Sequence, residues 1–155
     1  MSGNYSVLLS TAYLAPIQYY CKLLSYDKIY IEHFENYSKQ SYRNRSCILS
    51  ANGPLNISIP VKRGITDKIL TKDIQIDNSV RWKSIHLRAI ESAYRSSPFF
   101  IYYFEDIEFA YNENIDLLVN FNLKLQDIIL GFLNKKIEII PLVVKLNRSI
   151  GKTFI

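Results

Sequence analysis

A basic and aromatic stretch, "NYSKQSYRNRS" at residues 36–46, contains the side chains best suited to binding an anion. Arginine guanidinium groups bind phosphate or carboxylate through paired hydrogen bonds, and tyrosines can line a polar cleft. Residues 36–63 contain no Asp or Glu, but they include five cations: Lys39, Arg43, Arg45, Lys62 and Arg63. The pattern predicts an anion-binding site. The alternative is a solvated basic edge that discourages edge-to-edge pairing of sheets.

The two histidines could each transfer protons near neutral pH, because a free imidazole titrates at about 6.5. His33 follows Glu32 at the end of a predicted parallel strand, and ligands of open α/β sheets bind beyond the carboxyl ends of the strands. Glu32 and His33 are therefore candidate catalytic residues. His86, one turn after Trp82 in a predicted helix, is a further candidate base. A lone helical histidine is more often structural.

Other catalytic chemistries have no matching motif in the sequence. Cys21 and Cys47 lie far apart, and with only two histidines they form no Cys/His metal set at the usual spacings. Both cysteines fall in apolar patterns and are predicted to be packed. The sequence has no glycine-rich phosphate loop and no nucleophile elbow. We therefore expect no metal site, and the sequence indicates no particular cofactor.

Two strands and a helix are predicted to position the acid–histidine pair. Residues 7–11 are a short apolar run typical of a buried strand, and residues 28–33 alternate apolar and polar side chains. Pro16 lies where a helix could begin, and apolar residues follow it at helical spacing. Strand, helix and strand in quick succession predict a βαβ unit with adjacent parallel strands.

A hairpin is predicted to carry the basic residues. Asn52-Gly53 is a strong signal for a type I′ turn, and half-buried strands flank it between residues 46 and 61. Pro54 directly after this turn also leaves room for a slightly longer loop. The outer ends of such a hairpin would bring the arginines of the basic stretch close to Lys62.

The second half of the chain has helical periodicity. The first predicted helix contains four cations, Arg81, Lys83, Arg88 and Arg95, and a single acid, Glu91. An apolar run at residues 137–144 contains Pro141, which is typical of an edge strand or a packed tail. Caps are predicted at Asn78 or Ser79, at Ser97 before Pro98, and at Asn114. The predicted fold is α/β, with a mixed sheet that includes an N-terminal βαβ unit and a β-hairpin, followed by a helical second half.

Length and composition bound the class of protein. The 155 residues suffice for one domain, and 48% hydrophobic with 21% charged residues is ordinary for a globular chain. The net charge of +5 favours an anionic partner but does not choose among nucleic acid, a membrane surface and a sugar phosphate. The N-terminus lacks signal-peptide features, and no uncharged apolar run reaches the ~18 residues of a membrane helix. We therefore expect a soluble, cytoplasmic protein.

Several short motifs, in consistent order and spacing, resemble those of the WbqC-like protein family. They are "AYLAPIQYY", "YSKQSYRNRS", "ISIPVKR" and "IESAYRSSPFF", and the resemblance covers about residues 7–103. Thr11-Ala12 stands where many members have Gln-Pro, and Glu32-His33 where many have paired acids. No family motif is visible from about residue 112. The family pattern falls on Tyr13, Pro16, Tyr20, Tyr37, Lys39, Asn44, Arg45, Pro60, Val61, Lys62, Trp82, His86, Glu91, Tyr94 and Pro98.

The resemblance implies a bacterial protein of O-antigen or other surface-polysaccharide biosynthesis, with transfer of glycine or another amino acid to a sugar as the proposed reaction. Our leading hypothesis is a transferase, or a component of one, that acts on a nucleotide sugar or a sugar phosphate. Glu32, His33 or His86 would supply acid–base chemistry. The anionic substrate would be bound by Tyr37, Lys39, Arg43, Asn44, Arg45, Lys62 and Trp82.

Two alternatives stay open at this point. One is a non-catalytic module that binds such an anion or a partner enzyme. The other, which we favour less, is a small RNA-binding protein, which would need exposed stacking aromatics on a basic surface. We expect residues 1–155 to form a single domain of the family. Because family members usually continue beyond this length, a missing C-terminal extension stays open, as does the oligomeric state.

Overall fold

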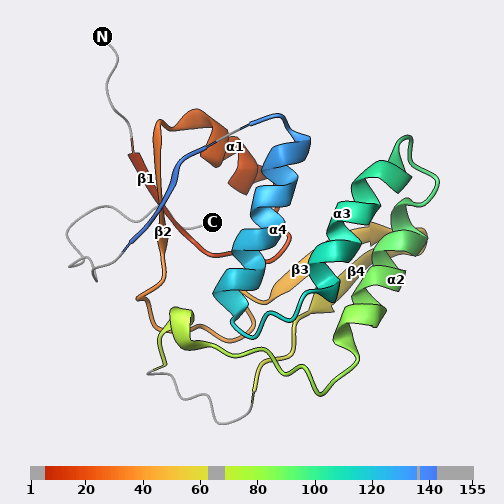
Figure 1. The fold of residues 1–155 in the computed structure, drawn as a ribbon, viewed down its shortest axis with the longest axis horizontal. Coiled ribbons are helices and arrows are strands. Elements are labelled where there is room, and N and C mark those ends of the chain that lie inside the picture. Colours follow the sequence, from red (N-terminus) through yellow and green to blue (C-terminus); the bar gives the residue numbers. More distant parts are fainter. Residues whose placement is uncertain (1–5, 63–68, 136, 143–155) are drawn as a thin grey trace.

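The strands in the described part of the chain form two separate sheets (Figure 1). A computed structural model describes residues 6–62, 69–135 and 137–142. One sheet is parallel and has the order β1-β2-β5, and the other is an antiparallel pair. The strands among the described residues are β1 (Ser6–Ser10), β2 (Lys28–Glu32), β3 (Arg45–Ser50), β4 (Gly53–Ser58) and β5 (Ile139–Pro141).

Helices connect and cover these sheets. The described residues form one short 3₁₀ turn and four α-helices, three of them in the second half. They are α1 (Ile17–Ser25), η1 (Thr71–Asp73), α2 (Trp82–Tyr94), α3 (Phe100–Asn112) and α4 (Leu118–Phe132). The predicted α/β class, with parallel strands and a helix first, a hairpin next and a helical second half, is confirmed. Among the described residues the parallel and antiparallel strands lie in separate sheets and not in one mixed sheet, because β3 and β4 pair only with each other.

The parallel sheet forms because apolar residues alternate in both of its first strands. Ile29 and Ile31 of β2 pair in register with Val7 and Leu9 of β1, and all four side chains are buried. They pack against Leu23 and two tyrosines of α1 and against Leu130 of α4, and we call this cluster the sheet core. Each such buried side chain contributes roughly 1.5–3 kcal/mol.

The predicted run at residues 137–144 is an edge strand over the part that the structure describes. Residues Ile139–Pro141 of β5 pair in parallel with β2, and β5 lies at the edge of the sheet. Proline lacks a backbone N–H, so an edge position suits Pro141. The backbone N–H of Leu142 extends the pairing by donating to the carbonyl of Ile31 at 3.2 Å.

The hairpin is present, but its turn lies one residue earlier than predicted. Ser50 pairs with Gly53, so Ala51 and Asn52 form the loop. Of these residues only Gly53 has a positive φ, at 104°. A type I′ turn needs positive φ at both loop residues, so the predicted turn type was wrong. A glycine that follows a turn of ordinary hand allows the strands to keep their twist.

The predicted helix caps were also wrong. The helices α2, α3 and α4 begin after Arg81, Phe99 and Leu117, and none of these residues makes a side-chain cap hydrogen bond. The predicted cap Asn78 instead accepts a hydrogen bond from the Trp82 indole at 3.3 Å and donates to Asp116 at 3.2 Å. At the start of α2, these side-chain contacts therefore use the amide that capping of the helix would need.

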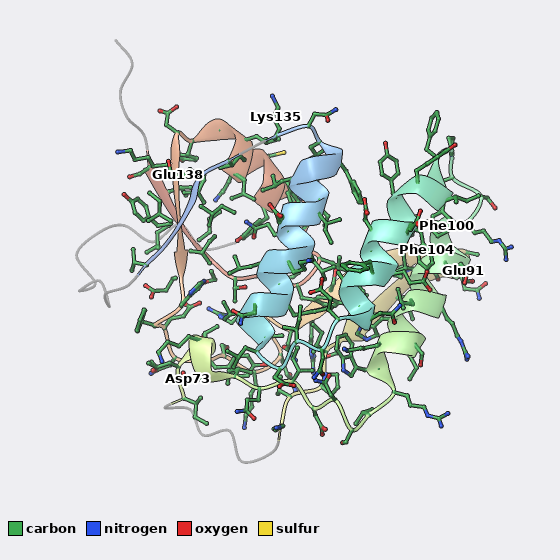
Figure 2. All side chains as sticks on the ribbon, viewed as in Figure 1. Asp73, Glu91, Phe100, Phe104, Lys135 and Glu138 are labelled. Atoms are coloured by element: carbon green, nitrogen blue, oxygen red, sulfur yellow. The ribbon has the colours of Figure 1, made fainter. Side chains whose placement is uncertain are left out.

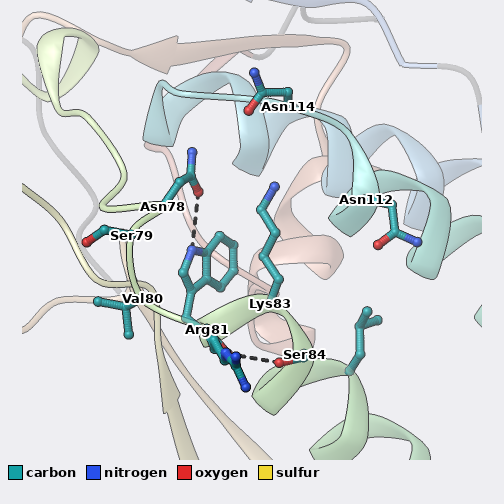
Figure 3. A pocket seen from close by; sticks show the side chains of 10 residues that line it. Asn78, Ser79, Val80, Arg81, Lys83, Ser84, Asn112 and Asn114 are labelled. Atoms are coloured by element: carbon teal, nitrogen blue, oxygen red, sulfur yellow. Dashed lines mark hydrogen bonds between the residues drawn. The ribbon is translucent and has the colours of Figure 1, made fainter.

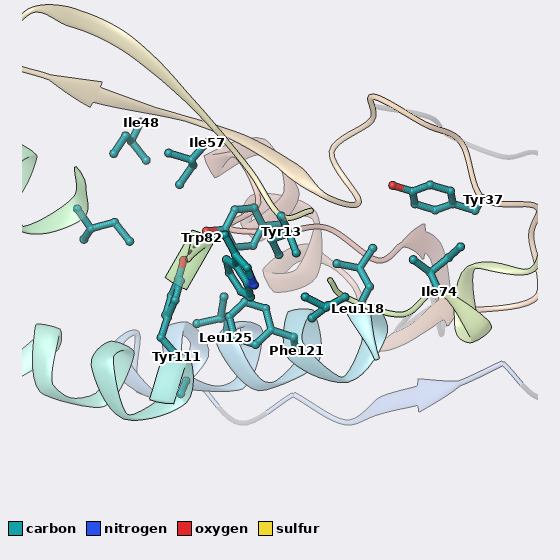
Figure 4. Close-up of a cluster of buried hydrophobic side chains, with 14 residues drawn as sticks. Tyr13, Tyr37, Ile48, Ile57, Ile74, Trp82, Tyr111, Leu118, Phe121 and Leu125 are labelled. Carbon is teal, nitrogen blue, oxygen red and sulfur yellow. Dashed lines mark hydrogen bonds between the residues drawn. The ribbon is translucent and has the colours of Figure 1, made fainter. Parts of the chain in front are cut away.

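A second cluster, which we call the aromatic core, lies between the β3–β4 hairpin and the helices α2, α3 and α4 (Figure 4). The ring of Trp82 meets Phe121 edge-on with centroids 5.3 Å apart, and Tyr111 meets Phe121 in the same way at 5.2 Å. Edge-to-face contacts of this kind stabilise aromatic clusters beyond simple burial.

Both cysteines, Cys21 and Cys47, are exposed, so their predicted packing was wrong.

Candidate functional site

A polar cavity opens at the N-terminal end of α2 (Figure 3). Its volume is about 430 Å³, within the size range of small-molecule sites. One wall comes from the segment that leads into α2 and from the first turns of that helix. The other wall comes from Asn112 at the end of α3 and from Asn114 two residues later. The lining residues are Asn78, Ser79, Val80, Arg81, Trp82, Lys83, Ser84, Leu87, Asn112 and Asn114.

Hydrogen bonds fix the segment that leads into this cavity. The backbone N–H and the hydroxyl of Ser79 both donate to Asp77 Oδ1, at 3.1 and 2.5 Å. Asn78 accepts the hydrogen bond of the Trp82 indole and donates to Asp116, so it links α2 to the segment before α4. This wall of the cavity is therefore held in place before any ligand arrives.

Lys83 bridges the two walls of the cavity. Its Nζ donates to the carbonyl of Glu113 at 2.7 Å and lies 5.9 Å from the centroid of the Trp82 ring. Burial lowers the pKa of this amine from its usual value, while the charge of Asp116 acts in the opposite direction. The carboxylate of Glu113 pairs with Lys124 at 2.7 Å.

The lining of the cavity is cationic and rich in amides. Arg81 and Lys83 supply positive charge, Asn and Ser side chains supply hydrogen-bond donors and acceptors, and the ten lining residues include no Asp or Glu. Phosphate oxygens accept charge-assisted hydrogen bonds from such cations, and amide and hydroxyl side chains match the hydroxyl groups of a sugar. The cavity is therefore suited to a polar anion that also carries hydroxyl groups.

A buried polar chain lies directly behind Trp82. Tyr13 joins His86 Nδ1 through a hydrogen bond of 2.8 Å and also hydrogen-bonds the hydroxyl of Tyr111. The His86 ring contacts Trp82 edge-on, with centroids 5.2 Å apart. Burial lowers the pKa of His86 to about 4, although a backbone hydrogen bond with Ser58 favours the proton. His86 is thus a neutral core residue behind the cavity wall, and its catalytic role remains a prediction.

The other predicted catalytic pair lies at the carboxyl end of β2. Glu32 is buried, and its Oε1 accepts a hydrogen bond from the backbone N–H of Phe34 at 3.0 Å. His33 is half-buried, and its Nε2 is buried without a hydrogen-bond partner among the described residues. Burial lowers the pKa of His33, while the carboxylates of Glu32 and Glu35 act in the opposite direction. This pair lines no part of the cavity in Figure 3.

Arg43 lies at the same end of the sheet, where its charge is already paired. Its Nε and Nη2 contact Glu35 Oε1 at 2.9 and 2.6 Å, and Nη2 also donates to Ser10 Oγ at 3.2 Å. Asn122 of α4 donates to the Arg43 carbonyl at 2.8 Å. Glu35 lies directly before residues 36–63, which contain no acid. Arg43 of that run is therefore paired with an acid that lies just outside it.

The remaining predicted binding residues lie outside the cavity, apart from Trp82, although the charges of Arg43 and Arg45 both act on the pKa of Tyr37. Asn44 and Tyr37 are buried, and Asn44 Nδ2 donates to the Ile59 carbonyl at 3.1 Å. Lys62 Nζ donates to Gln75 Oε1 at 2.8 Å, and Arg45 is an exposed residue of β3. Lys39 is exposed as well, and Arg63 lies outside the described residues. Of the seven predicted binding residues, only Trp82 lines the cavity.

The sequence pattern did not identify most of the cavity. The cations Arg81 and Lys83 on either side of Trp82 were the part of the sequence that could have indicated the cavity. Asn112 and Asn114 come from a segment about thirty positions further along the chain, and no local pattern connects them to α2. They join the site only because α3 folds back against α2.

The fold and the cavity define a small α/β protein with a parallel sheet, an antiparallel hairpin and a cationic, amide-lined pocket at the start of α2. Comparison with family models then places the chain: it belongs to the WbqC-like protein family, whose model matches residues 11–148. The match confirms the resemblance and extends it past residue 112, where no motif was visible. No curated protein and no solved structure shows significant similarity. Among the described residues, no helix is long and apolar enough to cross a membrane.

Proposed function

We propose that this protein takes part in bacterial O-antigen or other surface-polysaccharide biosynthesis and binds a nucleotide sugar or a sugar phosphate in the cavity at the start of α2. The observation that carries the proposal is the lining of that cavity, which combines Arg81 and Lys83 with amides and hydroxyls and contains no acid. Transfer of glycine or another amino acid to the bound sugar is the reaction that we favour. Family membership supports this assignment.

A second candidate is a non-catalytic binding module, and one observation favours it. The cavity lining contains no His, Cys, Asp or Glu, so Lys83 supplies the one side chain there that readily exchanges a proton. A lysine amine can accept a proton when its pKa falls, and burial acts on Lys83 in that direction. Replacement of Lys83 by Arg therefore separates the two candidates. The variant keeps the positive charge for binding and loses a titratable amine. A transferase would therefore lose turnover, whereas a binding module would keep most of its ligand affinity and has no turnover to lose.

Calorimetric titration tests the binding proposal directly. Wild-type protein is titrated with UDP-N-acetylglucosamine, UDP, inorganic phosphate and uncharged N-acetylglucosamine. We expect the two nucleotide ligands to bind and the neutral sugar to bind far more weakly. Arg81→Ala should weaken UDP-N-acetylglucosamine binding by ~10- to 150-fold, because a charge-assisted hydrogen bond contributes about 1.5–3 kcal/mol.

Arg88→Ala is the matched control, because Arg88 is an exposed arginine of the same helix outside the cavity. Equal losses of affinity in Arg81→Ala and Arg88→Ala would mean that general charge, and not the cavity, attracts the ligand. Tighter binding of a single-stranded RNA, with a steep dependence on salt, would replace the proposal with the RNA-binding alternative.

A further inference from the structure

Three buried side chains at one end of the parallel sheet each have a polar atom without a hydrogen-bond partner among the described residues. These atoms are His33 Nε2, Asn122 Oδ1 and Gln126 Nε2. Asn122 and Gln126 are only 1% and 4% exposed, and they lie one turn apart on α4. Buried polar atoms are nearly always paired, so three unpaired ones in one region call for a structural or functional explanation.

The strand register places His33 beside the end of β1. The last pair of the parallel ladder is Ser10 with Glu32, so the next residues, Thr11 and His33, lie side by side. Strand residues alternate between the two faces of a sheet. Thr11 and His33 therefore continue the face on which the apolar residues of β1 and β2 pack against α4. Ligands of open α/β sheets bind just beyond the carboxyl ends of the strands.

Helix α4 brings its two amides to the same place. Asn122 Nδ2 donates to Thr11 Oγ1 at 3.2 Å and to the Arg43 carbonyl at 2.8 Å, so the amide oxygen is the atom left over. Residues four apart share one face of a helix, which puts Gln126 between Asn122 and Leu130 of the sheet core. Both amides therefore face the carboxyl end of the sheet, beside Thr11.

The segment after β2 is held by its backbone, while the His33 ring is not held. The short helix η1, in which Asp73 is labelled in Figure 2, packs against α4 beyond the end of β2. The backbone N–H groups of Thr71 and Lys72 donate to the carbonyls of Glu35 and His33, at 2.9 and 3.0 Å. The half-buried His33 ring makes no hydrogen bond with a described residue, so it can turn aside for a ligand without breaking one.

The charges around His33 favour a positively charged group. Burial lowers the pKa of His33 and the carboxylates of Glu32 and Glu35 act in the opposite direction, so both acids lie close to its ring. Glu35 is paired with Arg43. Glu32 is 4% exposed and forms no ion pair with a described residue. A cation is the partner that a buried carboxylate lacks here.

We propose that the carboxyl end of the parallel sheet is a second ligand site, which binds a free α-amino acid. The ammonium group of the ligand donates to Asn122 Oδ1 and His33 Nε2 and is attracted by the carboxylates beside His33. The carboxylate of the ligand accepts a hydrogen bond from Gln126 Nε2. None of these residues lines the cavity at the start of α2, so the inference does not depend on the proposed function.

Calorimetric titration of the full chain with glycine and with L-alanine, without any sugar ligand, tests the proposal. We expect saturable binding with a dissociation constant of about 1 mM or below. Acetate, which lacks the ammonium group, and ethylamine, which lacks the carboxylate, should each bind at least ~10-fold more weakly, because each loses a charge-assisted hydrogen bond. The proposal is overturned if neither amino acid binds, or if acetate or ethylamine binds as tightly as they do.

Two variants separate a ligand site from an internal water site. Gln126→Met keeps the length of the side chain and removes its polar end, so it should weaken glycine binding by at least ~10-fold. Thermal unfolding of this variant without ligand should match the wild type or occur at a higher temperature, because an unpartnered buried amide is lost. His33→Leu, at a half-buried position, should weaken glycine binding to a similar degree.

Gln18→Met is the matched control, because it makes the same substitution at an exposed helical position on α1. It should leave glycine binding unchanged. A Gln126→Met variant that unfolds earlier and still binds glycine normally would show that a buried water pairs the amide, and it would overturn the proposal. Normal glycine binding in His33→Leu would overturn it as well.

Discussion

His86 makes the stability of the aromatic core sensitive to pH. It is 4% exposed, shares a hydrogen bond with the Tyr13 hydroxyl through Nδ1 and packs against Trp82. Protonation would put a charge among buried rings and leave both ring nitrogens able only to donate. At the residue scale, the histidine therefore acts as part of the scaffold behind the cavity wall.

We predict that the free energy of unfolding falls as the pH falls from about 6.5 to about 4. The pKa of His86 is about 4 in the folded protein and about 6.5 in the unfolded chain, so the unfolded chain binds more protons in this window. The stability that His86 contributes is fully present above about pH 6.5. It is lost as the pH falls toward about 4, by at most about 3 kcal/mol. Urea denaturation at several pH values measures it. His86→Gln should have a flatter profile, and equal slopes in both proteins would contradict the assignment.

Arg43 and Arg45 look alike in the sequence but should differ in their effect on stability. Arg43 and Glu35 form an ion pair with side chains only 13% and 11% exposed, so Arg43→Ala would leave a carboxylate unpaired. We expect it to lower the free energy of unfolding by about 3 kcal/mol, near the range for breaking a buried pair. The exposed Arg45 is the control, and Arg45→Ala should change stability by no more than about 0.5 kcal/mol. A similar loss in both variants would show that Glu35 is not the decisive partner of Arg43.

At the scale of the element, two glycines give a matched test of backbone conformation. A Cβ on Gly53 or on Gly131 would meet no atom within 4 Å, so neither substitution creates a clash. Gly53 has a φ of 104°, and Gly53→Ala should destabilise the hairpin by about 1–2 kcal/mol. Gly131 lies inside α4 without a positive φ, and Gly131→Ala should stabilise the protein by about 0.5–1 kcal/mol. Thermal unfolding compares them, and effects of the same sign would contradict the backbone explanation.

Elements defined by burial were predictable from the sequence, and elements defined by distant polar contacts were not. The two parallel strands and the hairpin follow from apolar alternation, which the buried face of a strand imposes directly. The cap predicted for α2 failed because Asn78 bonds to Trp82 and Asp116 instead of to the backbone at the helix start. The sequence predicts an anion site around Arg43 because it shows that several cations lie close together along the chain. It does not show that Glu35, just before the acid-free run, pairs with Arg43.

At the scale of the whole molecule, α4 connects the two hydrophobic cores. Leu118, Phe121 and Leu125 belong to the aromatic core, and Leu130 belongs to the sheet core. Between them Asn122 donates to Thr11 at 3.2 Å and to the Arg43 carbonyl, so the helix also ties the carboxyl end of β1 to the basic stretch. Damage to either core should therefore be transmitted to the other through α4.

The position of β5 in the chain has a consequence for synthesis on the ribosome. β1 and β2 emerge early and can pair at once, because only α1 separates them. The strand that covers the other edge of β2 lies at Ile139–Pro141, so that edge stays open while more than a hundred further residues are translated. At ~5–20 residues per second this interval lasts on the order of ten seconds, during which an unpaired strand edge can recruit neighbouring nascent chains. Chaperone binding to the nascent chain should accordingly concentrate in the period before β5 leaves the exit tunnel.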